Sequence, residues 1–402
     1  MNSIQKETPL RILAVTHFPP FRGGSARSAY ILFSSLAELG HQVYVLSSIT
    51  PDYNFIDPTL LNLPSTLTLS RYEVPHFNYN AYKLPPDLDY QEMEDTKIHH
   101  SLNKIILNFQ PDILIAGHET LARTIPALAT KLGIPSVILV RGSPTWRIIE
   151  GSYQYEYAQN WIDLFSNATL VITVAEYMRD GLHLLGVTSV QHIPNFLDTN
   201  QFIPRSRPTD IVRKLRIQDD DIVVVHASCM QPRKRAHDII DSAKESLKRN
   251  DRLIYVLVGE GDESESLKRD CKKYGISNRF RFPGKVDYSL MPDYLNLSDM
   301  VIQPSEGEGM SRVYLETQAC GRVLIASDIP PACELITHGE TGLLFKLGDV
   351  NDLMEKTLYA AGDYGIRKRI GKQSRDQITV HALEGVINQY LITFRNLVNR
   401  KM

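Results

Sequence analysis

Short apolar segments alternate with longer amphipathic segments along most of the chain, and this alternation is the strongest constraint on the fold. Residues 11–15 (RILAV) are typical of a buried strand, and residues 26–39 carry apolar side chains at helical spacing before Gly40. The alternation predicts an α/β fold in which doubly wound parallel sheets carry helices on both faces. Further strands are predicted at residues 43–47, 113–116, 136–140, 170–173, 190–193, 222–225, 252–258, 279–282, 300–302, 323–326 and 342–345.

The alternation is interrupted at residues 194–208, which hold three prolines and several polar side chains. A chain of 402 residues is also long for one domain, since a domain averages roughly 150 residues. We therefore expect two Rossmann-like domains, residues 1–198 and 209–380, joined by a linker at 199–208 and facing a central cleft. Residues 381–402 are expected to form a helix that packs back towards the first domain. The other predicted helices are residues 91–109, 120–132, 238–247, 264–274, 312–319 and 350–359.

The charge and cysteine content argue against several classes of protein. Lys and Arg number 44 and Asp and Glu number 46, so the net charge of -2 disfavours a general nucleic-acid binder. The four cysteines form no C-x-x-C pair, which favours reduced thiols over a disulfide framework or a zinc site. No apolar run approaches the ~18 residues that span a bilayer, and the polar start lacks the order of a signal peptide. We expect a cytoplasmic protein without a transmembrane segment, and a peripheral contact with the inner face of a membrane stays open.

Ligands of doubly wound sheets usually bind at the carboxyl ends of the strands, which directs attention to the strand-to-helix junctions. The first junction, THFPPFRGGSARS, carries Gly23 and Gly24 before a predicted helix. Adjacent glycines let the backbone approach a ligand, and a helix start offers unpaired N–H groups to an anion such as a phosphate. A flexible loop without a ligand is the alternative.

The second junction, VIQPSEGEGMSRVYLE, contains Glu308 and Glu316 on either side of a predicted helix start near Ser311. The backbone N–H groups of Met310, Ser311 and Arg312 would face a diphosphate. Glu316 would accept hydrogen bonds from paired hydroxyls such as those of a ribose. Like charges ~4 Å apart repel by about 4 kcal/mol at an effective dielectric of about 20, so two carboxylates beside an anion site require a cationic partner. The alternative is that both are surface glutamates on an ordinary helix.

The third junction, ASCMQPRKRAHD, supplies three consecutive cations, Arg233, Lys234 and Arg235, just before a predicted helix. Such side chains can neutralise a diphosphate and stabilise the negative charge that develops on a leaving group. The alternative is a solvated basic run on the protein surface.

Together with further short motifs, the three junctions resemble a known family. The chain is similar over nearly its whole length to the retaining glycosyltransferases of family 4 (glycosyl transferases group 1), which have the two-domain GT-B fold. The strongest match is EGMS…ETQACG, which resembles the family pattern of two glutamates separated by seven residues. Supporting motifs are Gly40-His41, HIPNFLDTNQF (192–202), LVGEGDE (257–263), FPGKV (282–286) and ELITHGETGLLF (334–345).

The resemblance implies roles for individual residues. Glu316 should bind the ribose of a nucleotide sugar, and Lys234 should hold its diphosphate. Glu308 should lie beside the transferred sugar, and His118, in AGHET, is matched to the family histidine near that sugar. The alternative for His118 is a hydrogen-bonded structural histidine. We therefore expect Glu308, Lys234 and His118 to be the catalytic residues.

Other positions are implied to bind the donor or to face the acceptor. On the donor side, Gly309 belongs to the loop before the helix start, and the segment from Gly284 to Val286 should contact the base. On the acceptor side, Gly23 and Gly24 should line the site. Arg141 stands where many family members have a histidine, so it could contact the acceptor or a phosphate, or pair with a nearby carboxylate.

The sequence departs from the family pattern at several positions. Ser228 stands where the family often has an arginine, six residues before the lysine, and Arg233 or Arg235 could replace that charge. Met310 and Ser311 stand where Phe-Gly is more usual. These departures keep open the alternative of a non-catalytic GT-B-like protein that binds a sugar nucleotide or scaffolds a partner.

A second glycine motif favours a different cofactor, but only weakly. Gly259-Glu260-Gly261 follows a predicted strand as in a dinucleotide-binding fingerprint, yet Ser264 occupies the position of the third glycine. We therefore expect no nicotinamide cofactor. No H-x-x-x-H or carboxylate cluster indicates a metal, and the resemblance implies a metal-independent reaction with a nucleoside diphosphate sugar as co-substrate.

These observations predict an enzyme that transfers a sugar from a UDP- or GDP-linked donor to a hydroxyl acceptor, with retention of configuration at the anomeric carbon. The acceptor could be a saccharide, a lipid-linked molecule or a small molecule. The donor sugar, the base and the oligomeric state do not follow from the sequence.

Overall fold

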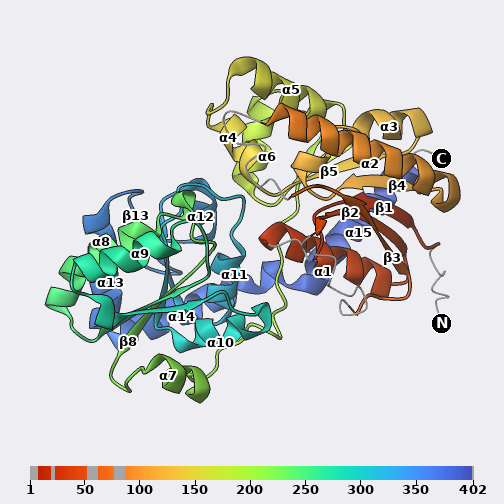
Figure 1. Cartoon of the computed structure of the whole chain (residues 1–402). Coiled ribbons are helices and arrows are strands. Elements are labelled where there is room, and N and C mark those ends of the chain that lie inside the picture. The colour runs from red at the N-terminus through yellow and green to blue at the C-terminus, as the bar shows by residue number, and fades with distance from the viewer. Residues whose placement is uncertain (1–7, 20–22, 52–61, 77–86, 401–402) are drawn as a thin grey trace, which may run out of the picture. The chain divides into compact units, whose positions relative to one another are not determined.

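The computed structural model describes residues 8–19, 23–51, 62–76 and 87–400 (Figure 1). The chain forms two compact units, the first comprising Met1–Pro194 with Glu384–Met402 and the second Asn195–Leu383. Both units are built on parallel sheets, as the alternation of strands and helices predicts.

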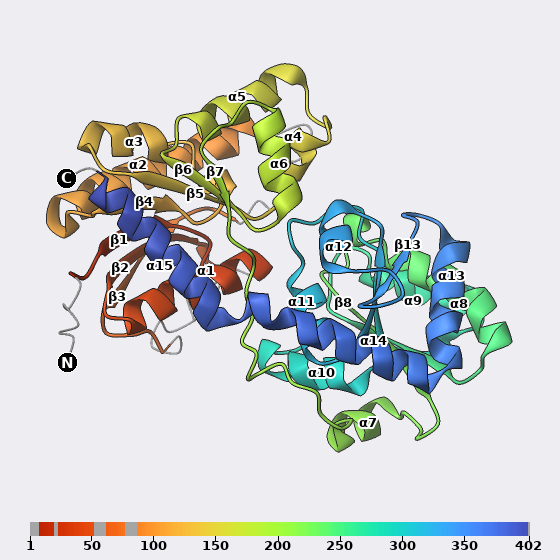
Figure 2. The same ribbon diagram turned by 180° about the vertical axis from the view of Figure 1, so that it is seen from behind.

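In the described part of the first unit, parallel strands form a 7-stranded sheet in the order β3-β2-β1-β4-β5-β6-β7. Figure 2 shows α15 running along this sheet, where Gln191 Nε2 donates a hydrogen bond to Thr393 Oγ1 at 3.1 Å. The strands are β1 (Arg11–Val15), β2 (Gln42–Ile49), β3 (Leu67–Glu73), β4 (Ile113–Ala116), β5 (Ser136–Val140), β6 (Leu170–Thr173) and β7 (Val190–His192). The helices are α1 (Gly24–Glu38), α2 (Leu88–Phe109), α3 (Ile125–Leu132), α4 (Ser143–Ile149), α5 (Tyr155–Ser166), α6 (Glu176–Leu184) and α15 (Leu383–Asn399).

The second unit, whose residues are all described, carries a 6-stranded parallel sheet in the order β10-β9-β8-β11-β12-β13. Its strands are β8 (Ile222–Ala227), β9 (Leu253–Val258), β10 (Phe280–Gly284), β11 (Met300–Gln303), β12 (Val323–Ser327) and β13 (Leu343–Phe345). Its helices are α7 (Thr209–Leu215), α8 (Ala236–Arg249), α9 (Ser264–Lys273), α10 (Met291–Leu297), α11 (Arg312–Ala319), α12 (Pro330–Leu335), α13 (Val350–Gly362) and α14 (Tyr364–Gln377).

The segment expected as a linker, residues 199–208, lies within the second unit. The Arg205 amide donates to Asn296 Oδ1 at 2.8 Å, and Arg207 Nη2 donates to Asp299 Oδ2 at 2.5 Å. The segment is thus tied to the residues around the start of β11. The domain boundaries given above stay a prediction.

The degree of burial explains which strands could be predicted from the sequence. Every residue of β5, β8 and β9 is buried, so each of these strands contains an apolar run of at least four residues. The predicted strands omit β3, which lies at the edge of its sheet. In its sequence, LTLSRYE, only Leu67 and Tyr72 are fully buried, so β3 has neither an unbroken apolar run nor a strict alternation.

The helix predicted over residues 120–132 is wrong in its first turn. A short 3₁₀ helix covers Glu119–Leu121, and α3 begins only at Ile125. Pro126 is the physical reason. In a longer helix its ring would clash with the carbonyl group of Ala122 and its missing N–H would leave that carbonyl unpaired, whereas both features are harmless in a first turn.

Two expectations drawn from composition concern cysteines and membranes. The cysteines are all free thiols, with Cys271 and Cys320 buried and Cys229 and Cys333 exposed. Within the described ranges, no helix combines the length and the apolar character needed to cross a membrane.

The Gly259-Glu260-Gly261 segment has a packing role. Gly259 has φ +124°, and a Cβ atom there would lie 1.8 Å from the Ser228 carbonyl oxygen. A Cβ atom at Gly261 would lie 2.4 Å from the Met230 carbonyl oxygen. The Met230 amide donates to the Glu260 carbonyl oxygen at 3.1 Å. Glycine therefore lets the loop after β9 pack directly against the loop after β8, which carries Lys234.

Replacing Gly259 with alanine should destabilise the second unit strongly. The side chain would combine a backbone conformation reserved for glycine with a steric clash against the backbone, which together cost about 2–5 kcal/mol. Gly275→Ala is the matched control, because Gly275 also has positive φ (+70°) but nothing lies within 4 Å of its Cβ position. Chemical denaturation should show a clearly larger loss for Gly259→Ala, and equal losses would contradict the packing role.

Candidate active site

An ion-paired cluster lies at the carboxyl ends of two neighbouring strands of the second unit. β8 leads through a 3₁₀ turn, Pro232–Lys234, into α8, and β11 leads through Glu308 into α11. Because β8 and β11 pair with each other, the loops that follow them meet. The Lys234 ammonium donates a hydrogen bond to Glu308 Oε1, and Arg233 Nη1 lies 3.7 Å from Glu308 Oε2. The structure therefore brings together residues of the second and third predicted junctions.

The charges of this cluster depend on one another. The side chains of Glu308 and Lys234 are each 11% exposed. Burial acts to raise the pKa of Glu308, but Lys234 and Arg233 outweigh this effect, so the pKa is lowered and the carboxylate stays ionised. Two cations face one carboxylate in the cluster, so it retains the positive charge needed to attract an anion.

Backbone donors lie next to the cluster at the start of α11. Ser311 precedes the helix in an extended conformation, and its side chain does not cap the helix. The amides of Gly309, Met310 and Ser311 donate no hydrogen bond to any described residue. Asn195 Nδ2 fixes this loop by donating to the Met310 carbonyl oxygen at 3.2 Å. Unpaired amides at the start of a helix are suited to binding an anion.

Glu316, on α11, is held by two neighbouring side chains. Tyr288 Oη donates to Glu316 Oε1 at 2.6 Å, and Arg312 Nε lies 3.3 Å from the same oxygen. Arg312 also donates to Tyr288 Oη at 3.0 Å and to the Phe196 carbonyl oxygen at 3.1 Å. The other carboxylate oxygen, Glu316 Oε2, makes no hydrogen bond with a described residue. Glu316 therefore has one fixed oxygen and one that can accept a hydrogen bond from a ligand.

The sequence analysis missed His226, at the end of β8. Its Nδ1 lies 2.9 Å from the Ile302 carbonyl oxygen, which can only accept, so Nδ1 carries the proton. Nε2 then accepts from the Ser228 hydroxyl at 2.7 Å. Burial lowers the pKa of His226 to about 4, and the nearby Lys234 contributes to this shift. The signal that could have identified His226 is a histidine near the end of the otherwise apolar segment IVVVHA.

In the first unit, His118 and Arg141 follow the neighbouring strands β4 and β5, and Glu119 joins their loops. The buried Glu119 carboxylate accepts from the amides of Arg141 at 3.0 Å and Gly142 at 2.9 Å. His118 Nδ1 lies 3.3 Å from the Thr120 amide, 2.9 Å from the Thr120 hydroxyl and 3.4 Å from Glu119 Oε2. Burial, with Arg141, lowers the pKa of His118 to about 3. At neutral pH, His118 is therefore uncharged, and Glu119 is a structural carboxylate that was not among the predicted site residues.

The glycine loop lies at the same edge of the first sheet. Gly23 has φ +127°, and α1 begins at Gly24, whereas residues 20–22 of this junction lie outside the described residues. β1, which precedes the loop, pairs with β4, which precedes His118. The ring centroids of His17 and His118 are 5.0 Å apart, so the two junctions are in contact.

Comparison with known families resolves the class of the protein. Residues 208–377 match the family described as Glycosyl transferases group 1, and residues 22–201 match Glycosyltransferase Family 4. The chain belongs to the family 4 glycosyltransferases. The two matched ranges between them cover the cluster around Glu308 and every described strand except β1.

Two similar proteins align with the glycosyltransferase over nearly its whole length. N-acetyl-alpha-D-glucosaminyl L-malate synthase of Bacillus anthracis is 22% identical over 386 residues, which cover 94% of this chain and 95% of the relative. Glycogen synthase of Mycobacterium tuberculosis is 24% identical over 395 residues, covering 92% and 90%. The chain is thus similar to enzymes with quite different products.

Solved structures of low sequence identity share the fold. HepE of Anabaena in complex with UDP has a TM-score of 0.75 and 18% identity, covering 96% of this chain and 99% of that chain. Sucrose-phosphate synthase of Thermosynechococcus elongatus has a TM-score of 0.78 and 18% identity, covering 97% and 99%. The glycosyltransferase therefore has the GT-B fold, as the resemblance implied.

Not every predicted donor residue joins the cluster of the glycosyltransferase. Arg235 pairs with Asp238 through Nε at 2.7 Å and Nη2 at 3.1 Å, whereas Arg233 reaches Glu308. Arg233 is thus the better candidate to replace the family arginine that is absent at Ser228. Gly284 is the last residue of the edge strand β10 and Val286 follows it, and no hydrogen bond or ion pair of the described residues links them to the cluster. Contact of these two residues with a base stays a prediction.

The buried neutral histidines predict how stability depends on pH. The folded-state pKa is about 3 for His118 and about 4 for His226, against about 6.5 in an unfolded chain. Below pH ~6.5 the unfolded chain therefore binds more protons, and the free energy of unfolding should fall by up to ~1.4 kcal/mol per pH unit for each histidine.

Denaturation of the wild type and of His226→Asn at pH 7.5 and pH 5.5 checks this prediction. Asparagine can keep the hydrogen bond to the Ile302 carbonyl oxygen but cannot titrate, so the variant should lose less stability on acidification than the wild type. A variant of the exposed His100, His100→Asn, should behave like the wild type. Equal losses of stability in His226→Asn and the wild type would contradict a lowered pKa of His226 in the folded protein.

Proposed function

We propose that this glycosyltransferase moves a sugar from a UDP- or GDP-linked donor to a hydroxyl acceptor with retention of anomeric configuration. One arrangement carries the proposal. A cationic cluster around Glu308, the amides of Gly309, Met310 and Ser311 and the carboxylate of Glu316 all follow β11 or its neighbour β8. Among the described residues, these three amides and Glu316 Oε2 have no hydrogen-bond partner. Together these groups suit a diphosphate joined to a pentose.

The cluster suits the departure of a nucleoside diphosphate. When the bond between the anomeric carbon and the phosphate oxygen breaks, negative charge develops on that oxygen. Lys234 and Arg233 would stabilise this charge together with the amides of Met310 and Ser311, and donors already in place need no reorganisation. We propose that these groups perform the neutralisation without a metal ion.

Glu308 would stabilise positive charge that develops on the transferred sugar. Glycosyl transfer passes through a state in which the anomeric carbon carries partial positive charge. Glu308, kept ionised by Lys234 and Arg233, can stabilise that charge without forming a covalent bond. The acceptor hydroxyl would attack from the face that the diphosphate leaves, and its proton would pass to the departing phosphate oxygen. Attack on that face accounts for retention.

Glu316 would recognise the ribose. Its Oε2 can accept a hydrogen bond from a ribose hydroxyl, while Tyr288 and Arg312 fix Oε1. Relatives support both bases, because HepE structures hold UDP and UDP-glucose, and a GDP-mannose-dependent mannosyltransferase of Corynebacterium glutamicum is 28% identical over 198 residues. We therefore leave the base as uracil or guanine and the acceptor as a hydroxyl compound of undetermined class.

Removing Lys234 should slow transfer strongly. Loss of one such donor in a pre-organised site typically lowers kcat by ~10²–10³-fold. The measurement is donor turnover, as transfer or slow hydrolysis, with UDP- and GDP-sugars and Lys234→Ala. Lys272→Ala, which removes an exposed lysine on α9, is the control and should retain wild-type turnover, and circular dichroism should show both variants folded. Near wild-type turnover in Lys234→Ala would contradict the role, and saturable donor binding without turnover in the wild type would favour a scaffold.

Removing the charge of Glu316 should weaken donor binding more than it lowers kcat. A hydrogen bond to a charged group is worth ~1.5–3 kcal/mol, so Glu316→Gln should raise the donor KM about tenfold or more. Tyr288→Phe releases Glu316 Oε1 and removes one acceptor of Arg312 but leaves the Glu316 carboxylate in place, so it should raise the donor KM less. Glu340→Gln, on an exposed loop, is the control. An unchanged donor KM in Glu316→Gln would rule out the ribose contact.

A further inference from the structure

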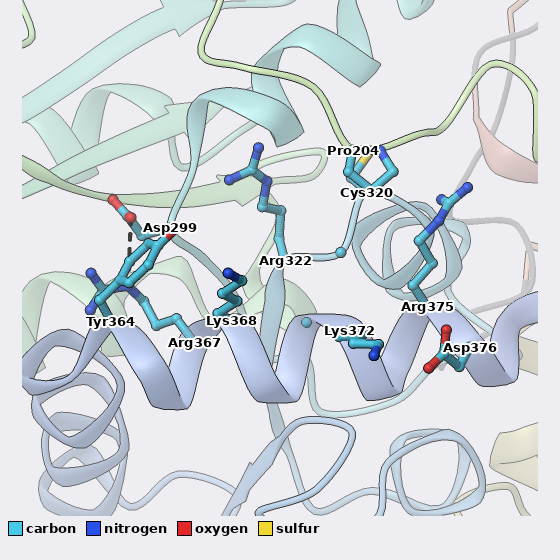
Figure 3. Close-up of a pocket in the computed structure, with 12 residues that line it drawn as sticks. Pro204, Asp299, Cys320, Arg322, Tyr364, Arg367, Lys368, Lys372, Arg375 and Asp376 are labelled. Carbon is cyan, nitrogen blue, oxygen red and sulfur yellow. Dashed lines mark ion pairs between the residues drawn. The ribbon is translucent and has the colours of Figure 1, made fainter.

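A cavity lies in the second unit between α14 and the turn that follows α11 (Figure 3). It has a volume of about 310 Å³, and none of the residues predicted to bind the donor lines it. Small-molecule sites in proteins start at roughly 300 Å³, so the cavity can hold a small ligand.

The lining of this cavity is strongly cationic. Five cationic side chains and two acidic ones face it, a local excess of positive charge in a chain whose net charge is -2. The cations are Arg322, Arg367, Lys368, Lys372 and Arg375, and the acids are Asp299 and Asp376. An excess of this kind in a concave space raises the local concentration of anions.

The acidic residues do not neutralise the lysines. Asp299 is shared by Arg207 at 2.5 Å and Arg367 at 3.6 Å. Lys368 and Lys372 lie one turn apart on α14, and neither ammonium group forms a hydrogen bond or ion pair with a described residue. Like charges one turn apart on a helix repel, and Asp376, one turn beyond Lys372, forms no ion pair with it, so an anion bound between or beside the two lysines would relieve this repulsion.

Arg322 adds a buried donor without an acceptor. Its Nη2 donates to the Arg205 carbonyl oxygen at 2.7 Å and to Asn296 Oδ1 at 3.1 Å. Its Nε is buried and has no hydrogen-bond partner among the described residues. A buried N–H group is normally paired, so the orphan donor indicates a place for an external acceptor.

Two glycines bring these groups close together. A Cβ atom at Gly371 on α14 would lie 2.0 Å from the Gly321 carbonyl oxygen, so only glycine lets the helix approach the turn so closely. In Figure 3, Lys368 and Arg375 extend from α14 towards the side on which Arg322 lies. Arg375 Nη1 donates to the carbonyl oxygens of Phe202, at 3.2 Å, and Ala319, which holds this side of the cavity in place.

We propose that this cavity binds the phosphate group of a small phosphorylated molecule, at a site separate from the donor site. Lysine and arginine together are the usual ligands of phosphate, since one supplies a compact charge and the other a planar set of donors. Tyr364, 69% exposed at the rim, offers a ring on which the non-phosphate part could pack. The concave shape and small volume favour such a molecule over a membrane surface.

Binding of inorganic phosphate and of glucose 6-phosphate to the full chain tests the proposal, by calorimetry at constant ionic strength. The double variant Lys368→Gln with Lys372→Gln should weaken binding of at least one of the two about tenfold or more. Arg369→Gln with Lys272→Gln removes two exposed cations outside the cavity and should leave binding unchanged. UDP should bind the wild type and the cavity variant alike, which separates this site from the donor site.

Three outcomes would overturn the proposal. The first is that neither ligand shows saturable binding. The second is that binding disappears in Lys234→Ala and persists in the cavity variant, which would place the phosphate in the donor site. The third is that the protein binds vesicles containing phosphatidylglycerol through Lys368 and Lys372 but binds neither phosphate compound, which would make this surface a membrane contact.

Discussion

A buried charge has to be paired, and the Lys234–Glu308–Arg233 cluster shows how far that requirement shapes the second unit. Removing one member of a buried pair leaves an uncompensated charge, which typically costs ~3–5 kcal/mol. Lys234 reaches Glu308 because β8 and β11 are neighbours and because two glycines, Gly259 and Gly261, let the loop after β8 pack against the loop after β9. Sheet order and loop packing thus determine where the positive charge of the site lies.

The fold could be predicted from the sequence wherever burial was complete. Strands such as β9 are almost entirely apolar because both faces of the sheet are covered, and glycines mark the turns between elements. Edge strand β3 has only two buried residues, and short helices such as α4 and α12 span fewer than two full turns, so they show little helical periodicity. Pro126 also shows that a single residue can override a helical pattern.

The site was predictable in its residue types but not in its pairings. Lys234 and Glu308 are 74 residues apart, and only the adjacency of β8 and β11 brings them into contact. The contacts of Arg312 with Tyr288 and Glu316, the bond between His226 and Ser228, and the carboxylate of Glu119 were not foreseen. Each depends on side-chain geometry at positions where the resemblance to the family offered no guide. Roles of individual residues in catalysis stay predictions.

Helix α11 connects the two charged regions of the second unit. Its start faces the loop of Glu308, and its last residue, Ala319, accepts a hydrogen bond from Arg375 of the cationic cavity. Glu316 lies between these ends. The start of α11 thus lies beside the amides of the Glu308 loop, and its last turn contacts the cavity, whose cations come from α14 and from Arg322.

The central claim is that the cluster around Lys234 and Glu316 holds a nucleoside diphosphate, and a crystal structure with UDP or GDP tests it most directly. The account predicts diphosphate oxygens within hydrogen-bond distance of Lys234 Nζ and the Ser311 amide, and a ribose hydroxyl on Glu316 Oε2. A nucleotide ordered anywhere else, including the cavity beside Lys368 and Lys372, with Lys234 and Glu316 untouched, would contradict it.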